Sequence, residues 1–409
     1  MTDAFPLKRF LFLQGPLSPF FHRLGGLLRA RGHGVYRINL CRGDTIFWPE
    51  PATDFTGTFD AWPGFIADFL ARHAITDMVL LGEQRDHHKT AIAAAHQAGV
   101  AVTVTDFGYI RPDWIILERD GMNRESRFPR DPDAIRALAA DLPPVDQEKR
   151  YIDDFAQQAR WDMQFHLGNL LPGKFPHYRS FLLHHPIPAY IGTGLALLRR
   201  KAETRRAEAL LAGLPQAAPR WIFAMQMETD YSIRAYSDFR NMDEPIEAAV
   251  ASFARAAPAD GHLLVKVHPL DPGLKPWRRM VAGMAARHGV AGRVHYLGAG
   301  TLDAMLATAR GVVTVNSTVG IRALQLGRAL HAMGEAIYRV PGLTHAGALD
   351  AFWAAAPPEP GLTEAFLRAI AAMLHVRGVY YREPGLTAAV EAAADRLERG
   401  LVGEKLPPG

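Results

Sequence analysis

Short apolar runs alternate with segments of helical spacing in two separate parts of the chain, and this alternation constrains the fold more than any other feature. Continuous apolar runs bounded by turn residues are typical of strands that are buried on both faces of a sheet. In the first part the predicted strands are 9–13, 35–40, 77–81 and 100–104, and the predicted helices are 20–31, 65–73 and 87–98. In the second part the predicted strands are 221–225, 262–269, 294–298 and 311–317, and the predicted helices are 245–256, 277–288, 301–309 and one from about 319.

Strands that are separated by helices predict parallel sheets covered on both faces, and 409 residues are too many for one hydrophobic core. The expected fold class is therefore α/β of the GT-B type, with two Rossmann-like domains whose parallel sheets face each other across a cleft. Any other pair of doubly wound domains remains the alternative from the pattern alone. The expected divisions are an N-terminal acceptor-side domain at 1–140, a helical or irregular connection at 141–219, a nucleotide-sugar-binding domain at 220–380 and a helical tail at 381–409.

Composition excludes several functional classes. The formal net charge is only +4, which does not favour nucleic-acid binding. The single cysteine, Cys41, permits no intrachain disulfide and fits a reducing compartment such as the cytoplasm. No apolar stretch reaches the roughly 18–20 residues that a membrane-spanning helix needs, so we expect a soluble or peripheral protein. Basic clusters at 199–201, 205–206 and 278–279 are either solvated helix faces or contacts to anionic headgroups.

Polar residues follow the predicted strands, where ligands of open α/β sheets bind. Asp106 follows the strand that ends at Val104, with Arg111 close enough in sequence to bind an anion. These two residues are equally compatible with an ordinary strand-to-loop connection.

Three polar residues crowd the end of the first strand of the second part. Alternation would place Gln226, Glu228 and Asp230 on one side of an extended chain. Paired carboxylates suit glycosyl chemistry, in which one attacks while the other moves a proton. The alternative is an acidic loop in which Asp230 caps the following helical turn.

The next two strand ends carry residues suited to a phosphate. Lys266, His268 and Pro269 end one predicted strand, and a histidine there either binds a phosphate or makes a structural hydrogen bond. The segment 316–318, which contains Asn316, Ser317 and Thr318, opens a predicted helix and supplies either an anion site or plain N-capping. No HExxH, CxxC, Walker or GxGxxG motif occurs, and no resident metal or cofactor is expected.

Taken in order, the stretches FLFLQGPLSPFF, CRGDTIFWP, GYIRPDWIILE, QMETDYS, LVKVHP and VNSTVG resemble capsule polysaccharide biosynthesis proteins of the KpsS type. The resemblance runs from about residue 10 to about 382 and leaves out the middle connection. It implies a β-Kdo transferase that moves Kdo from CMP-Kdo to a phosphatidylglycerol-type lipid acceptor and starts the linker of a capsular polysaccharide. The expected partners are a KpsC-type Kdo transferase and the capsule ABC exporter, at the inner face of the cytoplasmic membrane.

The resemblance also implies roles for single residues. Net retention is expected through a covalent intermediate on Asp230, with Asp106 in the proton-transfer or supporting role. The family pattern has a second acid where this chain has Phe107, so Glu228 remains a rival partner of Asp230. The remaining assignments are the donor phosphate site at His268, Asn316, Ser317 and Thr318, neighbouring roles for Gln226 and Lys266, and acceptor-side roles for Gln14, Arg42, Asp44 and Arg111.

Two other functions stay open at this point. One is a GT-B enzyme that uses another sugar nucleotide, such as an epimerase. The other is a scaffold or lipid-binding component of the capsule assembly without catalytic activity.

Overall fold

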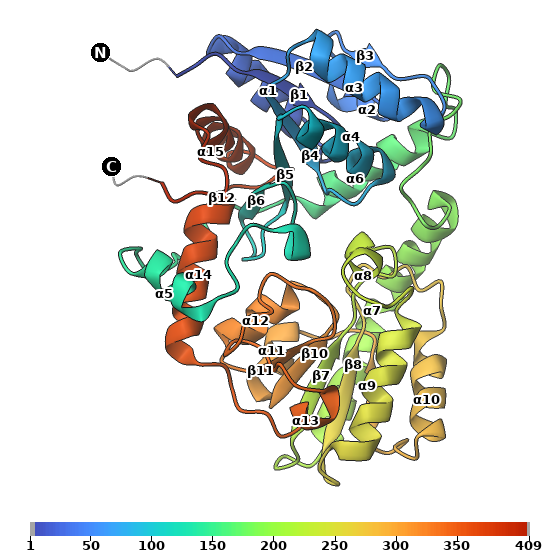
Figure 1. Ribbon diagram of the computed structural model, residues 1–409. Coiled ribbons are helices and arrows are strands. Elements are labelled where there is room, and N and C mark those ends of the chain that lie inside the picture. Colours follow the sequence, from blue (N-terminus) through green and yellow to red (C-terminus); the bar gives the residue numbers. More distant parts are fainter. Residues whose placement is uncertain (1–4, 407–409) are drawn as a thin grey trace. The chain divides into compact units, whose positions relative to one another are not determined.

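The structure is a computed structural model, and it describes residues 5–406. The chain divides into two compact units (Figure 1). Unit 1 contains the residues up to Phe128, then Asp141–Phe181 and the residues from Leu367 onward. Unit 2 contains Pro129–Ala140 and Leu182–Phe366. Each unit is therefore assembled from segments that are far apart in the sequence.

Unit 1 is built on a seven-stranded sheet in the order β12-β6-β5-β4-β1-β2-β3. The part from β3 to β6 has the 3-2-1-4-5-6 order of a Rossmann fold. The first five strands are parallel, whereas β6 is antiparallel to β5 and β12 is antiparallel to β6. The strands are β1 (Arg9–Phe12), β2 (Gly34–Asn39), β3 (Thr53–Asp54), β4 (Asp77–Leu81), β5 (Ala101–Phe107), β6 (Trp114–Arg119) and β12 (His375–Arg377).

Helices cover both faces of this sheet because alternate strand residues point to opposite sides. Phe10 and Phe12 of β1 pack on the side of α1 and α15, while Leu11 packs on the side of α3 and α4. The C-terminal helix α15 also pairs with the N-terminal part through Arg31, whose guanidinium lies 2.7 Å from Asp395. The helices of this unit are α1 (Phe20–Ala30), α2 (Asp44–Phe47), α3 (Trp62–Arg72), α4 (Asp86–Gln97), α6 (Phe155–Gly168) and α15 (Gly385–Arg399), with 3₁₀ turns at Phe59–Ala61 and Asn123–Glu125.

Unit 2 is built on a five-stranded parallel sheet in the order β11-β10-β7-β8-β9, again a doubly wound arrangement with its first strand in the centre. Trp221, Phe253 and Trp353 stack edge to face in its core. The strands are β7 (Arg220–Ala224), β8 (His262–Lys266), β9 (Val294–Leu297), β10 (Gly311–Thr314) and β11 (Ala329–Ala332). The helices are α5 (Pro132–Ala139), α7 (Pro186–Gly213), α8 (Tyr231–Ala235), α9 (Asp243–Ala256), α10 (Trp277–Arg287), α11 (Leu302–Thr308), α12 (Val319–Gln325) and α13 (Leu349–Phe352), and α14 (Pro360–Leu374) continues into unit 1.

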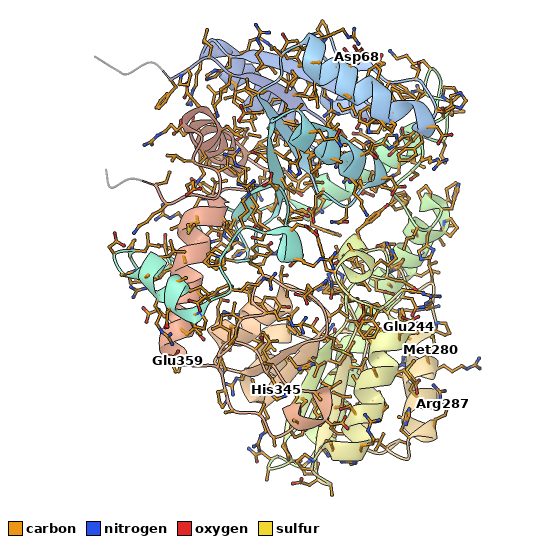
Figure 2. All side chains as sticks on the ribbon, in the orientation of Figure 1. Asp68, Glu244, Met280, Arg287, His345 and Glu359 are labelled. Atoms are coloured by element: carbon orange, nitrogen blue, oxygen red, sulfur yellow. The ribbon has the colours of Figure 1, made fainter. Side chains whose placement is uncertain are left out.

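The α/β class with two Rossmann-like units is confirmed, but the divisions along the chain differ from the predicted ones. The expected connection, 141–219, is shared between the units at Phe181, and unit 2 ends at Phe366. The short segment around α5 belongs to unit 2 because Arg136 forms an ion pair with Glu359, which Figure 2 labels, and Arg130 donates to the carbonyl of Ala336 at 2.9 Å. None of these tertiary contacts is visible in local sequence periodicity.

Several predicted strands end at other residues in the structure, and β5 and β8 show the physical reason most clearly. β5 continues through Phe107 because β6 pairs with it, and residue Asp106 lies opposite Ile116. The connection from β5 to β6 is short, which permits only an antiparallel neighbour and makes the predicted all-parallel first sheet wrong at this edge. β8 ends at Lys266, before Pro269, which has no N–H to donate to a neighbouring strand.

Among the described residues, no helix is long and apolar enough to cross a membrane.

Candidate functional site

Polar side chains meet at the carboxyl edge of the unit 2 sheet. Gln226 follows the central strand β7, and Asn316 follows its neighbour β10; both are buried. The Gln226 amide nitrogen lies 2.7 Å from Asn316 Oδ1, and the backbone N–H of Asn316 donates to Gln226 Oε1 at 3.0 Å. The Asn316 amide also donates to the carbonyl of Ser232 at 2.8 Å. These reciprocal bonds fix the ends of β7 and β10 against each other.

Asp230 is held at the edge of this network. Its Oδ2 accepts a hydrogen bond from the Gln226 amide at 3.0 Å, and its Oδ1 accepts one from the backbone N–H of Ser232 at 2.9 Å. The second bond makes Asp230 the N-cap of α8, as the structural alternative predicted. The two roles are compatible, since each carboxylate oxygen has further lone pairs. The result is a carboxylate in a fixed orientation that remains partly exposed.

Glu228 does not join this network, contrary to the expectation that it lies on the same side as Gln226 and Asp230. Its carboxylate forms an ion pair with Lys275, and the Lys275 ammonium also lies 3.0 Å from Asp243. The expected alternation fails because β7 ends at Ala224 and the chain then turns, with the N–H of Asp230 bonded to the carbonyl of Met227. No hydrogen bond joins Glu228 to Asp230 within residues 5–406.

Lys266 is the last residue of β8, beside the end of β7, and its side chain is buried. Its ammonium donates to the carbonyl of Val267 at 2.7 Å. Burial lowers the pKa of Lys266 to about 8, and the nearby positive charge of Arg200 adds to the effect. A buried cation without an acidic partner is costly unless an anion binds next to it.

His268 lies just beyond this lysine, and Pro269 after it is exposed. The Nδ1 atom of His268 accepts a hydrogen bond from the backbone N–H of Leu270 at 3.2 Å. In the neutral ring the proton is then on Nε2, which is the tautomer that donates to a phosphate oxygen.

Ser317 and Thr318 precede α12, which has only seven residues. The Ser317 hydroxyl accepts a hydrogen bond from the N–H of Val319 at 3.2 Å, whereas Thr318, at the N-cap position of α12, forms no side-chain capping bond. Gly320 lets this turn approach Tyr338 closely, since a Cβ atom there would lie 2.3 Å from the ring. The Tyr338 hydroxyl in turn donates to the carbonyl of Ser317 at 2.7 Å, which fixes the turn.

Asp106 belongs to unit 1 and lies inside β5 rather than after it. Its Oδ1 accepts from the N–H of Phe107 at 2.7 Å, and the Tyr380 hydroxyl donates to its backbone carbonyl at 3.0 Å. Arg111 lies over the Phe107 ring, with its Cζ atom 5.1 Å from the ring centre. Phe107, the residue that departs from the family pattern, therefore forms a surface on which Arg111 packs.

Two further buried carboxyl groups lie near Asp106, and sequence reasoning missed Glu83. Glu83 follows β4, the strand next to β5, and is 3% exposed. Burial raises the pKa of Glu83 to about 8, and the charges of Asp106 and Glu118 add to this rise. The Glu118 carboxylate accepts hydrogen bonds from the Tyr109 hydroxyl, at 2.6 Å, and from the Ser126 hydroxyl. A search for polar residues after every predicted strand would have found Glu83.

The pKa of Glu83 predicts a pH-dependent stability. An unfolded glutamate has a pKa of about 4.3, so between that pH and about pH 8 the folded chain holds a proton that the unfolded chain releases. The stability from the neutral carboxyl is fully present below about pH 4 and is lost as the pH rises through 8. Glu83→Gln should therefore reduce the fall in unfolding free energy between pH 5 and pH 9 by about 3 kcal/mol in urea titrations. Glu391→Gln, at an exposed position of α15, should show the same fall in unfolding free energy as the wild type. If E83Q also shows the wild-type fall, the raised pKa of Glu83 is contradicted.

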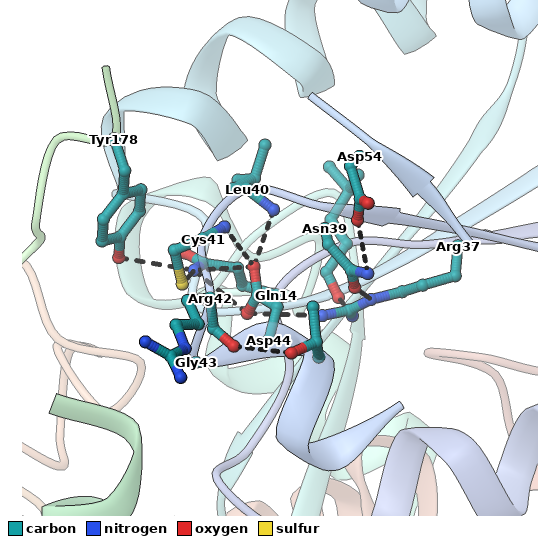
Figure 3. A network of polar contacts seen from close by, with 12 residues as sticks. Gln14, Arg37, Asn39, Leu40, Cys41, Arg42, Gly43, Asp44, Asp54 and Tyr178 are labelled. Carbon is teal, nitrogen blue, oxygen red and sulfur yellow. Dashed lines mark hydrogen bonds and ion pairs between the residues drawn. The ribbon is translucent and has the colours of Figure 1, made fainter. Parts of the chain in front are cut away.

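A second polar network of unit 1 lies at the carboxyl ends of β1 and β2 (Figure 3). Asp44 is buried and accepts hydrogen bonds from the N–H groups of Leu40, at 2.8 Å, and Cys41, at 3.2 Å. The Gln14 amide reaches both Asp44 oxygens at 3.2 Å, and Arg37 forms an ion pair with Asp44 at 3.3 Å. Gln14 and Asp44 therefore hold the loop in place, and their expected acceptor-side roles stay predictions.

Arg37 is a buried residue of this network that sequence reasoning missed. It is 5% exposed, and its side chain bonds to Asn39 at 3.0 Å and to the carbonyl of Leu13. Burial lowers the pKa of Arg37, and Asp44 opposes that shift. An arginine inside the apolar run VYRINL was the available signal, since buried guanidinium groups need partners.

A cavity lies beside this network, with an empty volume of about 260 Å³ that includes the solvent at its mouth. Arg42 lies outside it, is exposed and donates to the carbonyl of Leu171 at 3.1 Å. Gly43 permits close packing of the loop, because a Cβ atom there would lie 2.4 Å from the Phe165 ring. The lining residues are Gly15, Pro16, Leu17, Ser18, Phe21, Arg37, Asp44, Phe47 and Trp48.

Within residues 5–406, no group of three or more His, Cys, Asp or Glu side chains is arranged to hold a metal ion. At the carboxyl edge of the unit 2 sheet, Asp230 is held in one orientation and Lys266 supplies a buried ammonium. Unit 1 contains the buried acids Glu83 and Glu118 and, separately, the cavity beside Asp44. Together with the doubly wound sheets, these features define an α/β protein of two Rossmann-like units with polar side chains at the carboxyl ends of its strands.

Sequence comparison identifies the family. The model of the family described as "Capsule polysaccharide biosynthesis protein" matches residues 76–381, which is more than half of the chain. The chain belongs to this family, as its motifs predicted. Both the Gln226–Asn316 network and the Glu83–Asp106–Glu118 group lie within the matched residues.

Two relatives with capsule polysaccharide names agree with this assignment. The chain is 29% identical over 380 residues to the capsule polysaccharide export protein KpsS of Escherichia coli, covering 91% of this chain and 97% of that protein. It is 28% identical to the capsule polysaccharide modification protein LipB of Neisseria meningitidis serogroup B, covering 92% of each. Among solved structures, the β-Kdo 2,7 transferase of Thermosulfurimonas dismutans KpsC aligns with a TM-score of 0.45 and 12% identity, over 96% of this chain and 99% of the other.

Proposed function

We propose that the protein is a retaining glycosyltransferase that moves Kdo from CMP-Kdo to a phosphatidylglycerol-type lipid and so starts the linker of a capsular polysaccharide. Family membership supports a role in capsule biosynthesis. The observation that carries the enzymatic part is the Asp230 carboxylate, which Gln226 and the N–H of Ser232 hold in one orientation at a sheet edge.

The proposed reaction has two displacements. In the first, an Asp230 oxygen forms a bond to the anomeric carbon of Kdo while the bond from that carbon to the phosphate oxygen breaks, and the electron pair leaves with CMP. In the second, an acceptor hydroxyl attacks the same carbon, the bond to Asp230 breaks, and the hydroxyl proton passes to a general base. Two inversions give net retention, and the carboxylate also stabilises the oxocarbenium character of both transition states.

The leaving CMP gains negative charge, which positive and hydrogen-bonding groups at the same edge can stabilise. Lys266 supplies a buried ammonium, and His268 has the tautomer that donates from Nε2. Ser317 and Thr318 contribute at the turn before α12. We propose that these side chains bind the phosphate and that transfer needs no metal ion.

We assign proton transfer to Asp106 rather than Glu228. The ion pair between Glu228 and Lys275 keeps the Glu228 carboxylate occupied, whereas Asp106 lies beside the buried acid Glu83. Arg111, beside Asp106, is proposed to contact the acidic substrate.

The acceptor is proposed to bind on unit 1, where Gln14 and Asp44 keep the loop at the cavity in place and Arg42 lies exposed nearby. A lipid acceptor requires a peripheral position at the inner face of the cytoplasmic membrane. The proposed partners there are a KpsC-type Kdo transferase and the capsule ABC exporter, in line with the export role in the name of the E. coli relative.

The test is a transfer assay with purified protein. CMP-Kdo and a phosphatidylglycerol acceptor should yield CMP and a Kdo-lipid, which mass spectrometry detects, and calorimetry should show binding of CMP but not of UDP. Release of CMP without a glycosylated lipid would point to a different acceptor. If no sugar reaches any lipid and UDP binds in place of CMP, the protein is instead an enzyme of another sugar nucleotide.

A further inference from the structure

Helix α7 turns an apolar face outward. Ile187, Ile191, Leu195 and Leu198 are 44%, 60%, 44% and 82% exposed. Their spacing of four, four and three residues places them on one side of the helix. Exposed aliphatic side chains are usually scattered singly over a protein surface, whereas these four form a continuous stripe. We call these four residues the α7 stripe.

The packed side of α7 carries small residues instead. Ala207 is buried, and a Cβ atom at Gly192 would lie 2.2 Å from the carbonyl oxygen of Pro272. Glu203 on this side pairs with Arg278 of α10 at 2.5 Å. The helix is therefore already docked on unit 2 through its other face, so packing within unit 2 does not account for the α7 stripe.

A basic cluster follows the stripe on the same helix: Arg199, Arg200, Lys201, Arg205 and Arg206. Arg206 pairs with Glu203, and the other four form no ion pair within residues 5–406. Helical spacing places Lys201 and Arg205 on the same side as Leu198. The outer face thus changes along its length from bulky aliphatic to cationic side chains.

We propose that the outer face of α7 binds an anionic membrane surface, with the α7 stripe at the acyl boundary and Lys201 and Arg205, the cluster members on that face, at the headgroups. The aliphatic side chains match the apolar boundary of a lipid surface, and the unpaired cations match its anionic headgroups. Long basic side chains can reach the headgroups while their stems stay in apolar surroundings. From Ile187 to Arg205 the face extends for about 27 Å at the helical rise. This inference rests on the proposed function, which requires access to a lipid acceptor.

Co-sedimentation of the full-length protein with vesicles tests the proposal. The protein should bind vesicles of mixed phosphatidylglycerol and phosphatidylcholine at low salt, and should bind more weakly at high salt or to phosphatidylcholine alone. Ile191→Gln with Leu198→Gln should weaken binding at least tenfold, and Lys201→Gln with Arg205→Gln should weaken it and reduce the effect of salt. Leu7→Gln with Ile152→Gln, at positions that are 76% and 58% exposed outside α7, is the matched control and should bind as the wild type does.

Three outcomes would overturn the proposal. They are a wild type that does not bind the anionic vesicles, a stripe variant that binds them normally, or a wild-type dimer that the stripe variant converts to a monomer in sedimentation velocity. The last result would make the α7 stripe an interface between copies of the chain.

A soluble acceptor separates this proposal from the proposed function. With short-chain phosphatidylglycerol below its micelle concentration, the stripe variant should transfer Kdo at the wild-type rate while being slow with vesicles. Failure of the wild type on both acceptors would count against the transferase and leave the vesicle-binding result standing.

Discussion

Asp230→Asn is expected to lower the rate of Kdo transfer at least a thousandfold while CMP binding stays within about threefold of the wild type. The amide lacks the anionic oxygen that attacks the anomeric carbon, and loss of a nucleophile costs several powers of ten in rate. Asparagine is preferable to alanine here because its carbonyl oxygen can still accept the hydrogen bond from the N–H of Ser232 and cap α8. The new amide hydrogens face the Gln226 amide, so a loss of about 1 kcal/mol in unfolding free energy is expected.

The measurements are CMP release, calorimetric CMP affinity and urea unfolding of both proteins. Asp303→Asn is the control, because Asp303 is an exposed carboxylate of the same unit that pairs with Arg322 at 2.9 Å. Incubation with CMP-Kdo alone should give a covalent sugar adduct on the wild type and none on D230N. A variant that keeps a tenth of the wild-type rate would exclude Asp230 as the nucleophile.

Lys266→Met is expected to make the protein more stable and its CMP binding weaker. Burial lowers the pKa of Lys266 to about 8, from about 10.4 in an unfolded chain. The unfolded chain therefore holds the proton more tightly, and the cost to folding is fully present below pH 8 and disappears as the pH rises toward 10. Methionine removes the charge at similar volume, so the unfolding free energy at pH 7 should rise by about 2 kcal/mol, with a smaller gain at pH 10.

The same change should weaken CMP binding about tenfold, equivalent to about 1.4 kcal/mol, because the phosphate loses a buried cation. Calorimetry measures the affinity, and urea unfolding at pH 7 and pH 10 measures the stability. Lys89→Met, at an exposed position of α4, should change neither. A less stable K266M that binds CMP normally would show that Lys266 only supports the end of β8.

Local patterns in the sequence predict the regular elements well because they depend on near neighbours. The strand at 77–81 and the starts of α1, α10 and α12 agree with their predicted positions. The ends of the elements are harder to predict, because they depend on tertiary pairing. For example, β5 extends past Val104 only because β6 lies alongside it.

The candidate site shows the same limit more sharply. That polar residues gather at the carboxyl ends of β7, β8 and β10 follows from the topology of a parallel sheet. The direction of the Glu228 side chain does not follow from that topology. It depends on a turn at Met227–Asp230 and on Lys275, which comes from a distant part of the chain. The consequences of burial, such as the protonated carboxyl at Glu83 and the ion pair at Arg37, require the full three-dimensional packing.

The chain crosses from one unit to the other four times, and this has a consequence for its synthesis on the ribosome. β12 and α15 complete the sheet and core that begin with β1 and α1, yet they are translated after all of unit 2. Unit 2 has all of its residues once translation passes Phe366, whereas the N-terminal strands lack their neighbours β12 and α15 until those elements are made. A premature stop shortly after Phe366 would therefore leave unit 2 with all of its residues and unit 1 without β12 and α15.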